Sequence, residues 1–180
     1  MGTDITKEKI SVQKVIKAKK FAEKIHGDQM YGDHPYTYHL NMVSEIVSPF
    51  GEEARILGHL HDILEDTMVS EEEIQKEFGD RILKLVCLVS DCAGKNRKEK
   101  KLETNKKLSK IEEEDFVVLI VKVGDRTANV VNCILEKNKS LFNMYKKEHT
   151  EFKKAVYRPQ ICEALWAELD NAINIKVGED

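Results

Sequence analysis

The chain has 180 residues, of which 41% are hydrophobic and 34% charged, so it can bury a core and does not have the composition of a disordered segment. Its formal net charge of −3 excludes a protein that is basic overall, as many nucleic-acid binders are. Three prolines and nine glycines favour long helices over many short strands. The longest apolar run, residues 116–121, is far too short to cross a membrane.

Helical spacing of apolar residues begins near the N-terminus. Residues 12–25 are predicted to form an amphipathic helix, with lysines on the face opposite the apolar one. Gly, Asp and His dominate residues 27–35, which predicts a loop. Two further helices are predicted over residues 36–50 and 52–65. The apolar positions of the first helix are Val12, Val15, Ile16, Ala22 and Ile25.

Short sequence motifs mark expected helix ends and turns in the middle of the chain. Ser70 followed by Glu73 is a capping box, which predicts that a helix begins there. The sequence Phe-Gly-Asp at residues 78–80 is expected to end that helix and to start the next one. A turn is predicted at residues 94–97, before a lysine-rich stretch.

The segment 116–135 begins with β-branched residues but continues with helical spacing. Because no partner strand is evident elsewhere, it is predicted to be one long buried helix. Helices over residues 141–157 and 160–175 follow, separated by Pro159. The last of these is expected to face the core, and the oligomeric state is left open. Its apolar residues are Leu165, Trp166 and Leu169.

The cysteines indicate a reducing environment. None of the four lies in a CxxC pair, and each falls in an apolar or helical pattern, so buried free thiols are expected. Since no signal peptide is evident either, the protein is predicted to be cytoplasmic. The four are Cys87, Cys92, Cys133 and Cys162.

His61 and Asp62 are the residues most indicative of chemistry. On a helix, adjacent side chains point about 100° apart, so both can reach one ion beside the helix. Glu65 and Asp66 follow four residues after His61 and Asp62, which places each acid on the same face as its partner. Imidazole and carboxylate groups together suit Mn²⁺, Fe²⁺ or Zn²⁺. The alternative is an exposed acidic helix end.

Two more residues fit a metal site. His39 lies early in the second predicted helix, and Asp125 lies within the long apolar one. A buried aspartate needs a partner, because an unpaired charge there is costly. That partner is Arg126 if the role is structural and a metal if it is functional. Asn129 shares the face of Asp125 and is available for a substrate hydroxyl or phosphate.

The order of these residues resembles that of the HD superfamily of metal-dependent phosphohydrolases. HDxxEDT at residues 61–67 is similar to its (p)ppGpp hydrolase branch, which includes the hydrolase domain of RelA/SpoT proteins and the stand-alone small alarmone hydrolases. PYxxH at residues 35–39, FG at 78–79 and DRxxN at 125–129 resemble the same branch, in the same order. The resemblance covers nearly the whole chain and implies an all-α fold, a single compact multi-helix HD-domain bundle over residues 1–180.

The resemblance also implies a role for each matching residue. It implies four metal ligands with Mn²⁺ as the usual ion, an acidic pair that activates or orients the attacking water, and contacts to the nucleotide and its phosphates. The lysine-rich segment is alternatively a solvated helix face. The implied ligands are His39, His61, Asp62 and Asp125; the acidic pair is Glu65 and Asp66; the substrate residues are Asn129, Arg126, Lys95, Arg97, Lys98 and Lys101.

One position departs from the family. The family has a Gln-x-Arg element before PYxxH, and its arginine stacks on guanine, but this chain has Met30 there. Either Met30 or Tyr31 replaces the stacking partner, or the base preference differs.

The leading hypothesis is a metal-dependent hydrolase that removes the 3′-pyrophosphate of (p)ppGpp, with a small-molecule nucleotide as substrate and no membrane partner. A hydrolase acting on a different nucleotide and a catalytically silent nucleotide- or metal-binding module are the alternatives. Nucleic-acid binding would rest on the basic residues 95–110 alone, and the net charge and the lack of interleaved aromatic residues argue against it.

Overall fold

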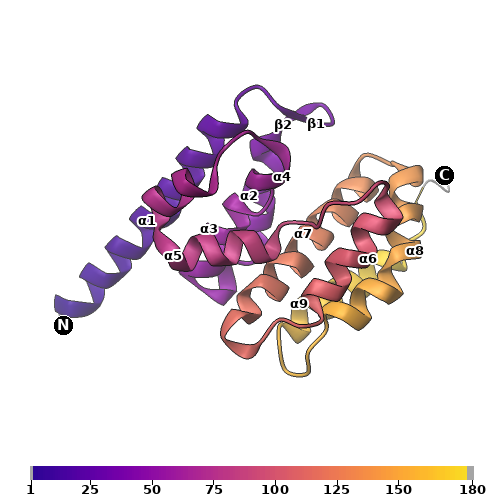
Figure 1. Ribbon diagram of the computed structural model, residues 1–180. Coiled ribbons are helices and arrows are strands. Elements are labelled where there is room, and N and C mark those ends of the chain that lie inside the picture. Colours follow the sequence, from indigo (N-terminus) through magenta and orange to yellow (C-terminus); the bar gives the residue numbers. More distant parts are fainter. Residues whose placement is uncertain (1, 178–180) are drawn as a thin grey trace. The chain divides into compact units, whose positions relative to one another are not determined.

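The computed structural model describes residues 2–177 of the chain, with side chains from residue 12 onward. The chain divides into two compact units, the N-terminal unit Met1–Ser90 and the C-terminal unit Asp91–Asp180 (Figure 1). Helices make up nearly all of the regular structure in both, which confirms the all-α class. The prediction of one domain over residues 1–180 stays a prediction. Among the described residues, no helix has the length and apolarity needed to span a membrane.

The N-terminal unit contains α1 (Gly2–His26), β1 (Met30–Tyr31), β2 (His34–Pro35), α2 (Tyr36–Ile46), the 3-10 helix η1 (Ser48–Phe50), α3 (Glu52–Leu60), α4 (Ile63–Asp66) and α5 (Glu71–Val89). α3 packs against both α1 and α2. The segment predicted to be a loop holds a short antiparallel hairpin, in which Met30 pairs with Pro35 and Tyr31 with His34. Gly32 turns this hairpin with a φ of 58°, a conformation that favours glycine.

Local sequence signals account for several helix ends in this unit. The capping box of Ser70 and Glu73 is present at the start of α5, as predicted. Gly79, with a φ of 81°, interrupts α5 where the sequence predicts one helix to end and another to begin. α2 ends at Ile46, earlier than predicted, because Pro49 disfavours helical geometry at the residue before it and a 3-10 turn replaces the last helical turn.

The buried face of α1 differs from the one predicted. Val15, Ala18 and Ala22 are buried, whereas Val12 and Ile16 are exposed. Ala18 and Ala22 are fully or almost fully buried, and α1 packs against α3. The spacing of apolar residues in the sequence does not distinguish the buried face of α1 from the apolar positions next to it.

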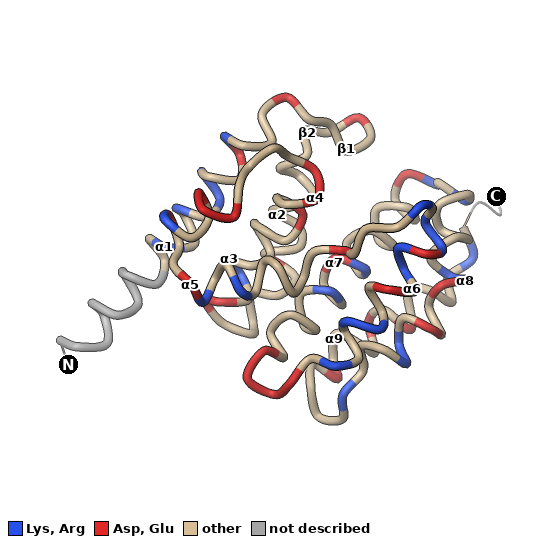
Figure 2. The backbone as a smooth tube through the Cα atoms, viewed as in Figure 1, with Lys and Arg blue, Asp and Glu red and all other residues tan. Residues whose placement is uncertain are grey.

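The C-terminal unit contains α6 (Arg97–Leu108), the 3-10 helix η2 (Glu113–Asp115), α7 (Phe116–Leu135), α8 (Lys139–Val156) and α9 (Glu163–Ile173). α7 has the bounds that the sequence predicts, and it packs against α8 and α9. On α9, Leu165, Trp166 and Leu169 are buried, which confirms that this helix faces the core. Figure 2 shows Lys and Arg along α6 and α8.

A charged cluster lies inside the C-terminal unit. Asp91 Oδ1 accepts a hydrogen bond from Lys122 Nζ at 2.9 Å, and Lys101 binds the other carboxylate oxygen. The side chains of Asp91 and Lys122 are 5% and 7% exposed. Burial would raise the pKa of Asp91, but Lys122 and Lys101 outweigh it and lower the pKa to about 2. We call these three residues the Asp91 cluster.

The cysteines are free thiols, as predicted. Cys133 and Cys162 are buried, whereas Cys87 and Cys92 are half-buried. Burial, and after it the charge of Glu163, raises the pKa of Cys162 to about 12, which keeps this thiol protonated and unreactive near neutral pH.

Candidate metal centre

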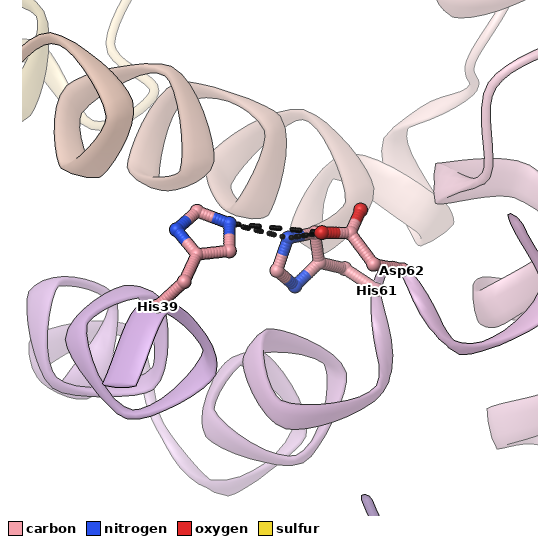
Figure 3. A group of neighbouring side chains, drawn as sticks. All are labelled: His39, His61 and Asp62. Carbon is pink, nitrogen blue, oxygen red and sulfur yellow. Dashed lines mark hydrogen bonds and ion pairs between the residues drawn. The ribbon is translucent and has the colours of Figure 1, made fainter. Parts of the chain in front are cut away.

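Three side chains of the N-terminal unit converge on one point. His39 comes from α2, and His61 and Asp62 come from the turn between α3 and α4 (Figure 3). His39 Nε2 lies 3.3 Å from His61 Nε2 and 3.6 Å from Asp62 Oδ2, and His61 Nε2 lies 3.0 Å from Asp62 Oδ2. Both imidazoles are buried, and the Asp62 side chain, 16% exposed, is the most accessible of the three. We call these residues the His39 cluster.

The helix predicted over residues 52–65 is interrupted here, and that prediction is wrong in this respect. α3 ends at Leu60 and α4 begins at Ile63, so His61 and Asp62 occupy a turn. Asp62 has φ −100° and ψ −1°, in a sparsely allowed region of backbone space where many active-site residues are found. Its carbonyl accepts hydrogen bonds from the amides of residues 65 and 66, which starts α4.

A backbone contact orients the ring of His61. His61 Nδ1 lies 2.8 Å from the carbonyl oxygen of Gly58, so Nδ1 carries the hydrogen and donates it. In a neutral imidazole this leaves a lone pair on Nε2, which faces Asp62 Oδ2. Two electron-pair donors 3.0 Å apart repel unless a proton or a cation lies between them. The turn therefore presents His61 in the tautomer that a metal ligand requires.

Gly58 also sets the distance between α2, which carries His39, and α3, which leads into the turn with His61 and Asp62. A Cβ atom at position 58 would lie 2.8 Å from the Cα of Ser44, closer than side chains pack. Ser44 Oγ donates a hydrogen bond to the carbonyl oxygen of Arg55 at 3.1 Å, which joins α2 to α3 at the same level. The absence of a side chain at Gly58 thus lets α2 approach α3 closely enough for His39 to face His61.

The spacing of the three donor atoms fits a divalent metal ion. An ion about 2.1 Å from each ligand places adjacent ligands about 3.0 Å apart at right angles and about 3.4 Å apart in a tetrahedron. The observed separations of 3.0, 3.3 and 3.6 Å cover this range. Two imidazole nitrogens and one carboxylate oxygen form a donor set that borderline divalent ions accept. The His39 cluster is therefore a candidate site for a divalent metal ion.

The acidic residues after Asp62 meet a tyrosine. Tyr36, the first residue of α2, places its hydroxyl 2.7 Å from Asp62 Oδ2 and 2.6 Å from Asp66 Oδ2. Asp62 and Asp66 therefore share a face, as their spacing predicts. Glu65 is half-buried, and Asp66 is exposed. Burial, and then the charge of Asp62, raises the pKa of Tyr36, so its hydroxyl keeps its hydrogen.

Aromatic rings pack behind the cluster. Tyr31 stacks on His39 with ring centroids 4.7 Å apart and planes 17° apart. Tyr36 stacks on His26 at 4.7 Å, with planes 7° apart. The rings restrict the orientation of His39 and Tyr36 from the side of the hairpin. The alternative role of Tyr31, stacking on a base, stays a prediction.

A further buried histidine, His59, lies near the end of α3, two residues before His61. His59 is 4% exposed, and its burial, followed by the charges of Lys19 and Arg55, lowers its pKa to about 4. It is therefore neutral at physiological pH. Its neighbours Leu57 and Leu60 on the same helix are also buried.

The other predicted site residues belong to the C-terminal unit. On α7, Asn129 Nδ2 donates to Asp125 Oδ1 at 2.5 Å, so these two side chains share a face as their spacing predicts. Asp125 as a fourth metal ligand stays a prediction. Lys95, in the bend before α6, and Lys98, in its first turn, are exposed, which fits either a phosphate contact or a solvated surface.

The two arginines proposed for the substrate bind one glutamate. Arg97 donates two hydrogen bonds to Glu148, at 2.7 and 3.0 Å, and Arg126 contacts Glu148 Oε2 at 3.3 Å. Arg126 is buried, and its guanidinium lies over the rings of Tyr145 and Phe152. These contacts give Arg126 a role in packing α7 against α8.

Sequence reasoning assigned no role to Tyr36 or Gly58. Tyr36 belongs to the PYxxH motif, and its position three residues before His39 was the available signal. The role of Gly58 depends on the close approach of Ser44, which no local pattern reveals. The Asp91 cluster was also missed, because Asp91 lies 10 residues from Lys101 and 31 from Lys122.

Comparison with known proteins identifies relatives. Guanosine-3′,5′-bis(diphosphate) 3′-pyrophosphohydrolase of Borreliella burgdorferi is 35% identical over 140 residues, which cover 74% of this chain and 21% of that protein. The enzyme of the same name from Aquifex aeolicus is 35% identical over 121 residues, covering 66% and 17%. The chain thus spans about a fifth of the length of these curated relatives.

Solved structures show the same fold. A metazoan ortholog of SpoT, described as hydrolysing ppGpp, has a TM-score of 0.71 and 23% identity, over 88% of this chain and 93% of that one. A protein of Listeria monocytogenes has a TM-score of 0.65 and 21% identity, over 81% and 96%. The sequence pattern of the HD domain matches residues 18–152, which include the His39 cluster and Asp125. With the fold, the cluster and this match in agreement, the chain belongs to the HD-domain family.

Proposed function

We propose that the protein is a divalent-metal-dependent phosphohydrolase that removes the 3′-pyrophosphate of (p)ppGpp. The observation that carries this proposal is the convergence of His39 Nε2, His61 Nε2 and Asp62 Oδ2 within 3.6 Å of one another. The names of the curated relatives support the choice of substrate. In this reaction water attacks the phosphorus bound to the 3′ oxygen, that P–O bond breaks, and pyrophosphate and GDP or GTP are released.

Mn²⁺ is the ion we propose for the site, with Asp125 as a fourth ligand. The sequence order of the HD motifs supports Asp125, and the mixed nitrogen and oxygen donors support Mn²⁺. A bound divalent ion supplies a water of lowered pKa and neutralises charge on the phosphate.

Glu65 and Asp66 are proposed to hold the attacking water and accept its proton. Their place directly after the His39 cluster supports this, since the amides of both bind the carbonyl of Asp62 and so fix α4 against the cluster. A carboxylate within hydrogen-bonding reach of the water is the group that general-base catalysis needs.

The substrate contacts are proposed from the motif resemblance. They are Asn129 for the nucleoside and Lys95, Arg97, Lys98 and Arg126 for the phosphates, with Tyr31 near the base. The two arginines share Glu148, so an arriving phosphate would compete with that carboxylate for them.

A release assay across a nucleotide panel tests the proposal. Metal-stripped protein is given Mn²⁺ and then ppGpp, deoxynucleoside monophosphates, cyclic nucleotides or NADPH, and released phosphate and pyrophosphate are measured. We expect pyrophosphate from ppGpp, and none without metal. Turnover of another nucleotide with ppGpp inert would contradict the alarmone substrate.

The second candidate is a phosphohydrolase for a different nucleotide. Met30 favours it, because this residue is 56% exposed on the hairpin where the family has an arginine. The same panel distinguishes the two. Nucleotide binding without any product would instead indicate a silent binding module.

A further inference from the structure

Tyr36 places its hydroxyl within hydrogen-bonding distance of two carboxylates, one in the candidate centre and one directly after it. Its hydroxyl oxygen lies 2.7 Å from Asp62 Oδ2 and 2.6 Å from Asp66 Oδ2. Asp62 Oδ2 is also the atom that faces the two histidine nitrogens. One hydroxyl therefore joins the candidate metal ligand to the acid that follows it by one helical turn.

We propose that Tyr36 is a positioning residue that couples metal binding at the His39 cluster to the orientation of Asp66. The proposal rests on the proposed function, because it takes the His39 cluster as the metal site and Asp66 as part of the water-holding pair. It extends that function by adding a residue that reaches the attacking water only through Asp66.

The hydrogen count of the phenol gives the coupling its physical basis. A tyrosine hydroxyl has one hydrogen, so it donates to one carboxylate at a time. At the other carboxylate, the lone pairs of the hydroxyl oxygen then face a carboxylate oxygen with no hydrogen between them, and this contact is repulsive. A cation bound to Asp62 Oδ2 withdraws charge from that oxygen and relieves the repulsion. The hydroxyl hydrogen is then free to bind Asp66 and hold it in place.

The hydroxyl cannot swing away easily, because the surrounding groups fix the ring. The ring stacks on His26 with centroids 4.7 Å apart and meets the edges of Tyr31 and His39. His26 is held in turn by Gln29, whose Oε1 lies 2.8 Å from Nδ1 of the imidazole. The Tyr36 amide donates a hydrogen bond to the Gln29 carbonyl at 2.9 Å, which ties the backbone to the same turn.

The test is Tyr36→Phe, which removes the hydroxyl and keeps the ring. Residues that hydrogen-bond to a metal ligand without binding the metal themselves typically contribute 10- to 100-fold to metal affinity. We therefore expect the Kd for Mn²⁺ to rise by about that factor. At saturating Mn²⁺, kcat should fall by about 10- to 100-fold, because Asp66 loses its fixed position. Calorimetric titration with Mn²⁺ gives the first value independently of any substrate.

Tyr38→Phe is the matched control. Tyr38 lies on the same helix two residues later, and its ring stacks on His34 at 4.4 Å. We expect this variant to keep the wild-type affinity for Mn²⁺. The melting temperature of each metal-free protein reports on folding, and we expect that of Tyr36→Phe to stay close to wild type.

The outcomes separate this inference from the proposed function. Wild-type affinity and kcat in Tyr36→Phe would overturn the role of Tyr36, and so would a lowered metal-free melting temperature with unchanged affinity. A wild-type protein that binds no divalent ion would instead overturn the metal centre on which the proposed function rests. Weaker Mn²⁺ binding in Tyr36→Phe alone would support the coupling even with ppGpp inert.

Discussion

Each unit of the molecule contains a buried polar cluster, and the two are built on different principles. In the Asp91 cluster, a buried carboxylate binds two lysine ammonium groups, so the negative charge is matched by cations that the protein itself supplies. In the His39 cluster, two imidazole nitrogens and a carboxylate oxygen converge on one point, with no lysine or arginine among the three residues. A cluster of the first kind contains its own counter-charges, whereas the second has the donor set of a candidate metal site. The difference separates a structural role from a functional one.

Removing a ligand should have the largest effect. We expect His61→Ala to lose Mn²⁺ and to lower pyrophosphate release by roughly 10³-fold or more, because a bound cation contributes several kcal/mol to such reactions. Asp62→Ala should behave in the same way. Metal analysis of the purified variants, combined with circular dichroism to confirm the fold, checks this. Full metal content in His61→Ala would contradict the assignment of the His39 cluster, and not the Asp91 cluster, as the metal site.

Glu65→Ala should separate chemistry from binding within the same region. We expect it to keep its metal and to lose about 10²- to 10⁴-fold in kcat, since it removes the proposed base and no ligand. Single-turnover assays at saturating Mn²⁺ provide the measurement. A variant with full turnover would refute the role of Glu65.

Asp91→Asn should affect the other cluster and produce the opposite pattern. It leaves Lys122 buried beside a neutral group, which should cost about 3–5 kcal/mol of stability at neutral pH, with unchanged Mn²⁺ affinity. The pKa of Asp91 is lowered from 3.8 to about 2 on folding, so its contribution is complete above pH 4 and is lost as the pH falls through 2.

Urea unfolding at several pH values tests this prediction. The stability gap between wild type and Asp91→Asn should be widest at neutral pH and should narrow as the pH falls from 4 toward 2. A gap that is absent at neutral pH, or that widens in acid, would show that Asp91 and Lys122 do not form a stabilising pair.

Gly58→Ala should produce a smaller effect that still distinguishes the units. The added Cβ would lie 2.8 Å from Ser44 Cα, and relieving this contact costs about 1–3 kcal/mol. Because α2 and α3 must shift, we also expect weaker Mn²⁺ binding. Gly94→Ala is the control, with its Cβ 2.6 Å from the Lys100 amide nitrogen in the C-terminal unit. It should lose stability and keep its Mn²⁺ affinity, and equal affinities in both variants would contradict the role of Gly58.

Patterns within one segment predicted the fold well. The helical spacing of residues 116–135 identified α7, and the capping box at Ser70 marked the start of α5, because both depend on neighbours a few residues apart. The break after Leu60 was not predictable in this way. No proline or helix-capping motif marks this position, and the turn contains a contact from His61 to the carbonyl of Gly58 that the sequence pattern does not reveal.

The same distinction between local patterns and long-range contacts applies to the candidate site. His39, His61 and Asp62 were identified from their chemistry and order, and the structure brings these three together. The hydroxyl of Tyr36 reaches Asp62 across 26 residues, a distance over which sequence spacing carries no information about contact. The base preference also stays open at Met30, because recognition of a base depends on a surface that the spacing of motifs does not define.

Titration of metal-stripped protein with Mn²⁺, followed by pyrophosphate release from ppGpp, tests the central claim most directly. The His39 cluster predicts no release without metal, and release that rises with Mn²⁺ until the cluster is saturated. The same titration of His61→Ala should remain flat. Release that persists after stripping, or that rises equally in His61→Ala, would contradict a metal-centred hydrolase built on this cluster.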